Sequence, residues 1–156
     1  MIAALLAAML TSAPVVAGEG EAIVFTRKPT LCPCPPDGCF QCAEVTVTLP
    51  LAGPAHARIV SPLDGSVEER DFAVPEMQAE SVRHRLAAYR PAEGSKSFDG
   101  AACKALWTDG TYYDIAWQSG AGAQHSLHLY TGCDPERNRV MAEAVGQAWA
   151  DLPIPH

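Results

Sequence analysis

The chain has 156 residues, of which 48% are hydrophobic and 19% charged, and its formal net charge is −7. This length and apolar content are typical of one folded domain and exclude a disordered chain. An acidic chain repels phosphate backbones and anionic lipid headgroups. The composition therefore argues against nucleic-acid binding and against attachment to a membrane surface.

Residues 1–17, MIAALLAAMLTSAPVVA, are predicted to be a signal peptide. The apolar block over 2–10 is shorter than the roughly 20 residues of a membrane span, so we expect no stable membrane insertion. Val15 and Ala17 are small residues at the positions that precede a cleavage site. We expect cleavage within a few residues of Ala17, which leaves 18–156 as a single disulfide-stabilised domain in the periplasm or outside the cell.

The first half of the domain contains strand patterns. A strand is expected over 22–29, and the segment 31–41 is expected to be irregular because its prolines remove backbone donors. The stretch 43–49 alternates valine and leucine with threonine, which predicts a half-buried strand. Residues 56–62 and 66–74 flank Asp-Gly and predict a hairpin.

The second half is expected to begin with a helix over 75–91, where apolar residues recur at helical spacing between two prolines. Residues 93–101 are expected to form a loop. A second Asp-Gly, at 109–110, predicts a hairpin that joins 104–107 to 111–118.

A last strand over 125–132 is expected to lead into a closing helix over 135–152. Pro135 suits the first position of that helix, and Asp134 can cap it. Strands gathered around two amphipathic helices predict an α+β fold. We expect an antiparallel sheet of five to six strands, with both helices on one face and the other face in solvent.

The chain has six cysteines, and an exported chain favours their use as disulfides. They allow 15 connectivities, among which sequence cannot choose. The simplest set closes the N-terminal four on themselves and joins Cys103 to Cys133. A tight hairpin at 109–110 would hold that last pair about 20 Å apart, beyond disulfide reach. Either 103–107 is not a strand in that register, which we prefer, or Cys103 pairs with the cluster. The candidates are Cys32, Cys34, Cys39, Cys42, Cys103 and Cys133.

An alternative interpretation makes Cys32, Cys34, Cys39 and Cys42 a metal-binding or thiol-redox site. The spacing is shorter than in most structural zinc modules, although three of the four fit a plant-type iron–sulfur run. The C-x-x-C at 39–42 leads into a strand and so lacks the helix N-terminus that activates a thiol. We therefore predict no bound metal and no cofactor, and keep this site as the alternative.

GCFQCAEVTVTL, then a hairpin, a helix, TDGTYYDIAW and a late GCD before a closing helix, resembles uncharacterised bacterial secreted α+β domains whose cysteines lead into a strand. Cys32 and Cys34 are additions to that pattern. The resemblance implies the fold and export, and it brings no activity, ligand or partner with it.

A surface patch is predicted from strand alternation. Tyr112, Asp114, His128 and Tyr130 fall on the outer face, in a register that allows Asp114 to pair with His128. The patch either contacts a partner or contains only an exposed pair worth a few tenths to about 1 kcal/mol. The three tryptophans are expected between sheet and helices.

No catalytic residue is predicted, because the chain lacks a nucleophile elbow, a phosphate-binding loop and a zinc-protease motif. The interpretation is an exported binding or inhibitory module, more consistent with a non-catalytic role than with an enzyme, whose partner is an unknown protein or small ligand. A second alternative is a small hydrolase, since triad residues need not be adjacent in sequence. The sequence contains no signal for the oligomeric state.

Overall fold

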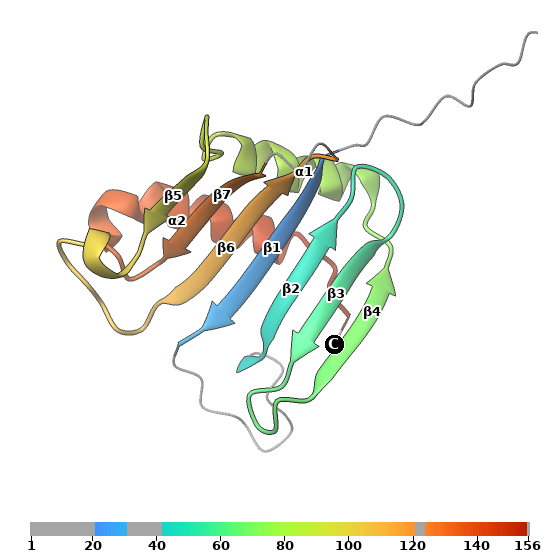
Figure 1. The fold of residues 1–156 in the computed structure, drawn as a ribbon, viewed down its shortest axis with the longest axis horizontal. Coiled ribbons are helices and arrows are strands. Elements are labelled where there is room, and N and C mark those ends of the chain that lie inside the picture. Colours follow the sequence, from blue (N-terminus) through green and yellow to red (C-terminus); the bar gives the residue numbers. More distant parts are fainter. Residues whose placement is uncertain (1–20, 31–41, 121–123, 156) are drawn as a thin grey trace, which may run out of the picture.

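The computed structural model describes residues 21–30, 42–120 and 124–155. The predicted signal peptide and the cysteines at 32, 34 and 39 lie outside these residues. Figure 1 shows a sheet with helices behind it. The elements are β1 (Ala22–Pro29), β2 (Glu44–Leu49), β3 (Ala55–Val60), β4 (Val67–Phe72), α1 (Glu76–Ala87), β5 (Ser95–Phe98), the short 3₁₀ turn η2 (Gly100–Ala102), β6 (Thr111–Gln118), β7 (Gln124–Tyr130) and α2 (Pro135–Ala150).

The sheet has seven strands in the order β4-β3-β2-β1-β6-β7-β5. The predicted α+β class is confirmed, but the prediction of five to six antiparallel strands is wrong in two respects. The sheet has one strand more, and β5 runs parallel to β7. β5 replaces part of the predicted loop over 93–101. Its SKSF sequence is largely exposed and shows no apolar alternation, because this edge strand is held by main-chain pairing with β7.

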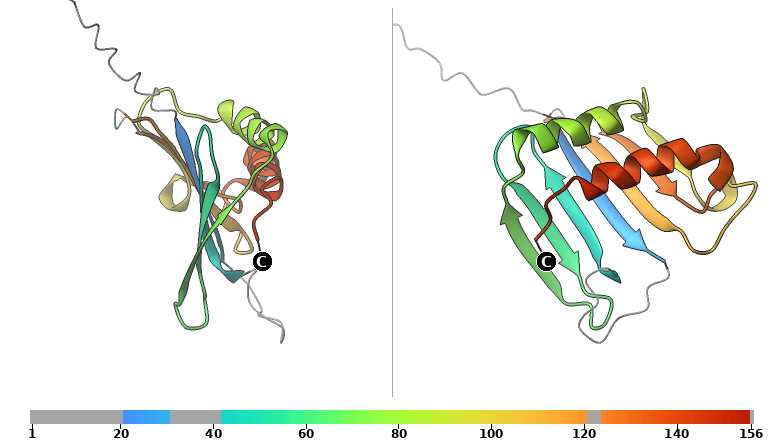
Figure 2. Two further views of the ribbon diagram at one scale, coloured as in Figure 1. Left: turned by 90° about the vertical axis from the view of Figure 1, so that its right-hand side faces the viewer. Right: turned by 180° about the vertical axis from the view of Figure 1, so that it is seen from behind.

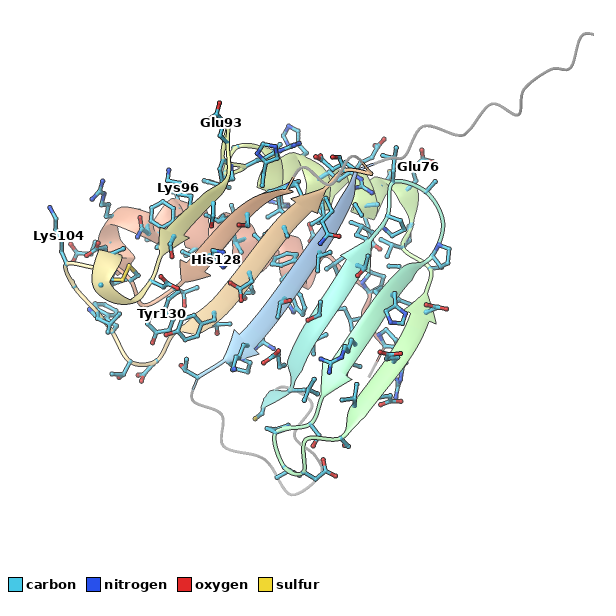
Figure 3. All side chains as sticks on the ribbon, viewed as in Figure 1. Glu76, Glu93, Lys96, Lys104, His128 and Tyr130 are labelled. Carbon is cyan, nitrogen blue, oxygen red and sulfur yellow. A yellow bond between two sulfur atoms is a disulfide. The ribbon has the colours of Figure 1, made fainter. Side chains whose placement is uncertain are left out.

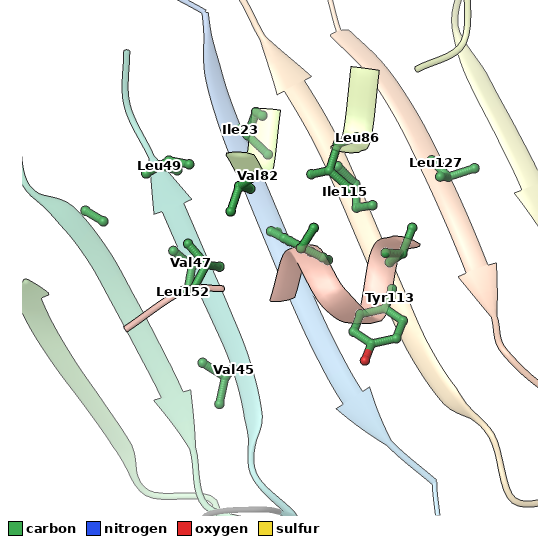
Figure 4. Packing of buried hydrophobic residues seen from close by; sticks show 14 of the residues in the cluster. Ile23, Val45, Val47, Leu49, Val82, Leu86, Tyr113, Ile115, Leu127 and Leu152 are labelled. Carbon is green, nitrogen blue, oxygen red and sulfur yellow. The ribbon is translucent and has the colours of Figure 1, made fainter. Parts of the chain in front are cut away.

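Both helices cover the same face of the sheet, as the sequence predicts (Figure 2). The side chains between the two layers form the core, part of which Figure 4 shows from close by. Phe25 is fully buried and meets Trp149 of α2 edge-on, with the ring centroids 5.0 Å apart. Val82 and Leu86 of α1 are also fully buried. Each such side chain contributes about 1.5–3 kcal/mol through removal from water.

The opposite face carries the other half of the strand alternation, and we call it the open face. Strand register places its side chains in rows that cross the sheet. One row runs from Glu69 of β4 to Ser97 of β5 through Arg58, Thr46, Thr26, Asp114 and His128. The row beside it contains Asp71, His56, Thr48, Val24, Ala116, Ser126 and Ser95.

The hairpin β3–β4 forms where the sequence predicts it. Gly65 has φ 71°, and Ser61 and Ser66 close the turn through a 2.9 Å backbone hydrogen bond. The turn end of this hairpin extends beyond the two helices (Figure 2). β4 has the sequence VEERDF, and none of its residues is buried. This edge of the sheet is therefore ordered mainly by strand pairing.

The hairpin predicted around 109–110 is wrong. The segment before β6 is a loop that forms one isolated β-bridge, from Leu106 to Cys133, which lies after the end of β7. Trp107 donates its N–H to the carbonyl of Gly132 at 2.8 Å, while its side chain is 63% exposed. Its expected place between sheet and helices is thus also wrong, whereas Trp117 is buried there and Trp149 packs against the core.

In the part of the chain that the structure describes, neither helix is long and apolar enough to cross a bilayer.

Candidate functional site

The loop before β6 is tied to the segment between β7 and α2 by a disulfide. Cys103 and Cys133 are bonded, with their Cα atoms 5.2 Å apart and a sequence separation of 30. This confirms the predicted pair, and the reason that it fits is that 103–107 is not a strand. In the chain-entropy model a closed loop of this length contributes about 3–4 kcal/mol.

Cys42, just before β2, is also disulfide-bonded, and it is 8% exposed. A disulfide sulfur is not the thiolate that a zinc site needs, whereas a thiol-redox pair is itself a disulfide in its oxidised form. Within the described ranges there is no free cysteine and no group of three or more side chains placed to hold a metal ion. The remaining three cysteines of the N-terminal cluster lie outside those ranges.

Asp134 fixes the same loop from the other side. The sequence suggests it as the cap of α2, but its side chain makes no capping hydrogen bond. Its backbone has φ 42°, and its carboxylate accepts the N–H groups of Ala105 and Lys104, at 2.7 and 3.0 Å. The Ala105 N–H, then that of Lys104, lowers the pKa of Asp134 below 3.8. The carboxylate therefore holds the loop over 103–110, which we call the disulfide loop, and does not cap α2.

Tyr130 is the polar anchor of this region. Its hydroxyl donates to the Trp107 carbonyl at 2.7 Å and accepts the Gly110 N–H at 3.1 Å. A Cβ on Gly110 would lie 2.4 Å from the Tyr130 ring, so glycine here permits close approach. Tyr130 is only 4% exposed, which corrects its predicted place in an exposed patch. Tyr112 stacks on it with the centroids 4.5 Å apart.

Asp114 and His128, which the strand alternation allowed to pair, are in contact on the open face. The His128 Nδ1 atom lies 2.6 Å from the Asp114 carboxylate, and the two side chains are 41% and 53% exposed. Figure 3 shows His128 of β7 on the face turned to the viewer, with Tyr130 farther along the same strand. Asp114 and His128 are brought together because β6 and β7 pair in the register that sets them opposite each other.

Ser126 is a third member that the sequence analysis missed. Its Oγ lies 3.4 Å from the His128 Nε2 atom, so the ring bridges a carboxylate and a hydroxyl. Ser126 and His128 are two residues apart in one strand and therefore share a face. That parity is visible in the sequence and would have found the serine.

A second histidine–aspartate pair, also missed, lies at the other side of the open face. His56 of β3 meets Asp71 of β4, with Nδ1 and Oδ1 2.8 Å apart. Among the described residues, the carboxylate is the only hydrogen-bond partner of this ring. The Asp-Gly pattern at 64–65 would not have given this pair. A two-residue turn there sets Ala73 opposite His56, whereas the turn that forms is longer and sets Asp71 there.

The side chains in the middle of the open face are short. Thr26 and Thr46, on neighbouring strands, share a hydrogen bond of 2.9 Å between their hydroxyl oxygens. Val24, Thr48 and Ala116 lie in the adjacent row and are half-buried. The open face thus presents a flat floor with a histidine–aspartate pair toward each side.

Comparison with protein-family models, with curated proteins and with solved structures found no match to this chain.

Proposed function

We propose that this chain is an exported, disulfide-stabilised module that binds a protein or a small ligand on its open face. The observation that carries this proposal is the asymmetry of the sheet: two helices cover one face, and the other is left with polar side chains fixed by cross-strand contacts. The binding role itself requires no catalytic chemistry.

The dimensions of the open face support a macromolecular partner. Seven strands at a spacing of about 4.8 Å make it about 29 Å wide. With strands about 20 Å long, the face covers on the order of 600 Å². A stable interface takes about 800 Å² from each partner, so this face supplies most of one.

Export is supported by the chemistry of the cysteines and by the sequence of the leader. Disulfides persist in oxidising compartments, and Cys103–Cys133 is formed. The proposed location is therefore the periplasm or the exterior of the cell. The metal or thiol-redox alternative depends on cysteines that lie outside the described residues, and nothing in the described ones favours it.

The export half of the proposal is tested with the full chain expressed in a bacterial host and then fractionated. We expect a periplasmic product whose intact mass matches a start near residue 18, with no thiol that reacts with an alkylating reagent. An uncleaved product in the cytosol with reactive thiols would contradict export, and metal bound in stoichiometric amount would favour the alternative.

The binding half is tested by photo-crosslinking from two exposed positions. A photoreactive residue at Arg58 of β3 lies on the open face, and one at Gln78 of α1 lies on the helix-covered side. In the native compartment we expect discrete crosslinked products from position 58 and none from position 78. Products from position 78 alone, or the same products from both, would refute the open face as the binding surface.

A further inference from the structure

The open face contains a connected chain of carboxylate, imidazole and hydroxyl. Asp114 contacts the Nδ1 atom of His128 at 2.6 Å, and the Nε2 atom of the same ring lies 3.4 Å from the Ser126 hydroxyl. A nucleophile, a base within reach of it and a third group that orients the base are the parts of an acyl-transfer site. In this chain they come from two adjacent strands.

The contact with Asp114 sets the state of the imidazole. A carboxylate at Nδ1 favours the tautomer with its proton on that nitrogen, which leaves a lone pair on Nε2. That lone pair is directed at the Ser126 hydroxyl. The 3.4 Å between these atoms exceeds the usual nucleophile–base hydrogen-bond distance of about 2.6–3.2 Å. Such contacts are often longer before a substrate is bound.

We propose that Ser126 is a nucleophile that accepts acyl groups from activated carboxylic esters, with His128 as general base and Asp114 as the residue that positions it. Ser126 Oγ forms a bond to the ester carbonyl carbon, and the bond from that carbon to the leaving oxygen breaks. The serine proton passes to His128 Nε2 and then to the departing alcohol or phenol. Water attacks the acyl-serine, which releases the acid and restores the hydroxyl.

The neighbours of Ser126 define the class of substrate. Ala116 lies opposite it on β6 and Val24 lies next on β1, so the acyl group meets a shallow apolar floor. The backbone N–H of Ser126 donates to the Gly94 carbonyl at 2.9 Å and cannot also stabilise an oxyanion. Since oxyanion donors supply much of the rate in acyl transfer, we expect slow reaction with small acyl groups on good leaving groups, and an acyl-serine that accumulates.

His56 and Asp71 provide an internal control for this inference. Their pair has the same atoms in contact at 2.8 Å, but within the described part of the chain no hydroxyl is hydrogen-bonded to the ring. The inference concerns Ser126 alone and does not rest on the proposed binding partner. If no binding partner is found, the proposed reactivity of Ser126 still stands. If Ser126 proves unreactive, the proposed binding on the open face still stands.

The test uses the purified oxidised chain with 4-nitrophenyl acetate and, separately, with a fluorophosphonate probe, followed by intact mass and peptide mapping. We expect one acyl or phosphonyl group on Ser126 and none after Ser126→Ala. His128→Gln lowers the labelling rate by roughly 10²-fold or more, the range of a lost general base. His56→Gln and Ser97→Ala leave the labelling rate unchanged, because these residues lie on the same face of the sheet but are not hydrogen-bonded to Ser126, His128 or Asp114.

Asp114→Asn tests the positioning role through a signal that a structural role would not change. The ¹⁵N shifts of His128 are expected to report a proton on Nδ1 in the parent chain and a shift of that proton toward Nε2 in the variant, with slower labelling. Labelling that maps elsewhere, that survives Ser126→Ala or that is absent from the folded parent chain overturns the proposal. So does an equal loss of labelling in His56→Gln.

Discussion

The two histidine–aspartate pairs of the open face have the same contact in different surroundings. The His128–Asp114 pair sits on β6 and β7, beside the disulfide loop, and its ring also meets Ser126. The His56–Asp71 pair sits on the hairpin β3–β4, whose turn end extends beyond the helices. The contact alone is therefore a common cross-strand pair. What distinguishes the first is the Ser126 hydroxyl at the other ring nitrogen.

The two sides of the sheet also differ in how they are held. Near β6 and β7, a disulfide, the Tyr130 hydroxyl and the Asp134 carboxylate all fix one loop. On the other side, β4 relies on its pairing with β3 and on one turn. Segments with few buried apolar contacts open first in the native state. We therefore expect the β3–β4 side to open at a lower free energy than the β6–β7 side.

The largest expected effect comes from removal of the disulfide. The double substitution Cys103→Ala and Cys133→Ala should lower the free energy of unfolding by about 3–4 kcal/mol, because the unfolded chain regains the entropy of an open loop. Denaturant titration measures this. Native-state amide exchange should show faster opening of the β6–β7 side and little change in β3 and β4. A loss spread evenly over both sides would contradict the comparison.

The next effect is on the Tyr130 anchor. Tyr130→Phe leaves the buried Gly110 N–H and the Trp107 carbonyl without their partner. A buried polar group left unpaired costs about 1–3 kcal/mol. The matched control is Tyr112→Phe, whose ring is 36% exposed, with an expected change within about 0.5 kcal/mol. Equal losses from the two substitutions in thermal unfolding would argue against the anchor.

Substitution of either histidine should lower the stability of the protein by a similar amount, but only substitution of His128 should lower the rate of acyl labelling. His128→Gln and His56→Gln each remove an exposed cross-strand pair, which is worth about 0.2–1 kcal/mol. Denaturant titration should give similar small losses, while acyl labelling falls only with the first. If His128→Gln destabilises the chain far more than His56→Gln, slower labelling would reflect unfolding, and the label rate would have to be measured on the folded fraction.

The smallest effect concerns two exposed carboxylates, one on each side. Backbone N–H groups, of Ala105 for Asp134 and of Ser66 for Asp64, are the main cause that lowers each pKa below 3.8. Because the folded-state pKa is depressed, the stabilisation is present above the unfolded value and is lost as pH falls through the folded value. Carbon-detected NMR titration should show both carboxyls titrating below 3.8. Asn substitution at either position should flatten the acid side of the stability profile.

Strand alternation allowed the sequence to predict most of the sheet and one part of the site. The alternation of β6 and β7 placed Asp114 and His128 on the same face, and the register of the two strands sets them opposite each other. The same rule would have included Ser126. β5 could not be found in this way, since its serines and lysine bury little apolar surface and its order comes from a partner remote in sequence.

Errors arose where long-range ties override local signals. Asp109-Gly110 has the composition of a hairpin turn, yet Gly110 is needed there because the Tyr130 ring lies against it. Trp107 has the hydrophobicity of a core residue, but the hydrogen bonds of its backbone leave the side chain outside. Asp134 has the place of a helix cap and binds a remote loop instead. Such ties depend on the disulfide pairing, which composition does not determine.

The charges of β4 have a consequence for how these molecules behave when crowded. Glu68 and Arg70 point toward the helix-covered side of the sheet and pair with each other on β4, the last strand on this side among the described residues. A second copy that added its own strand to this edge would have to strip these charged groups of water, and in a parallel, in-register pairing it would also bring like charges together. Charged residues at a sheet edge oppose such growth. The rim formed by VEERDF should therefore keep concentrated solutions of the protein free of fibres.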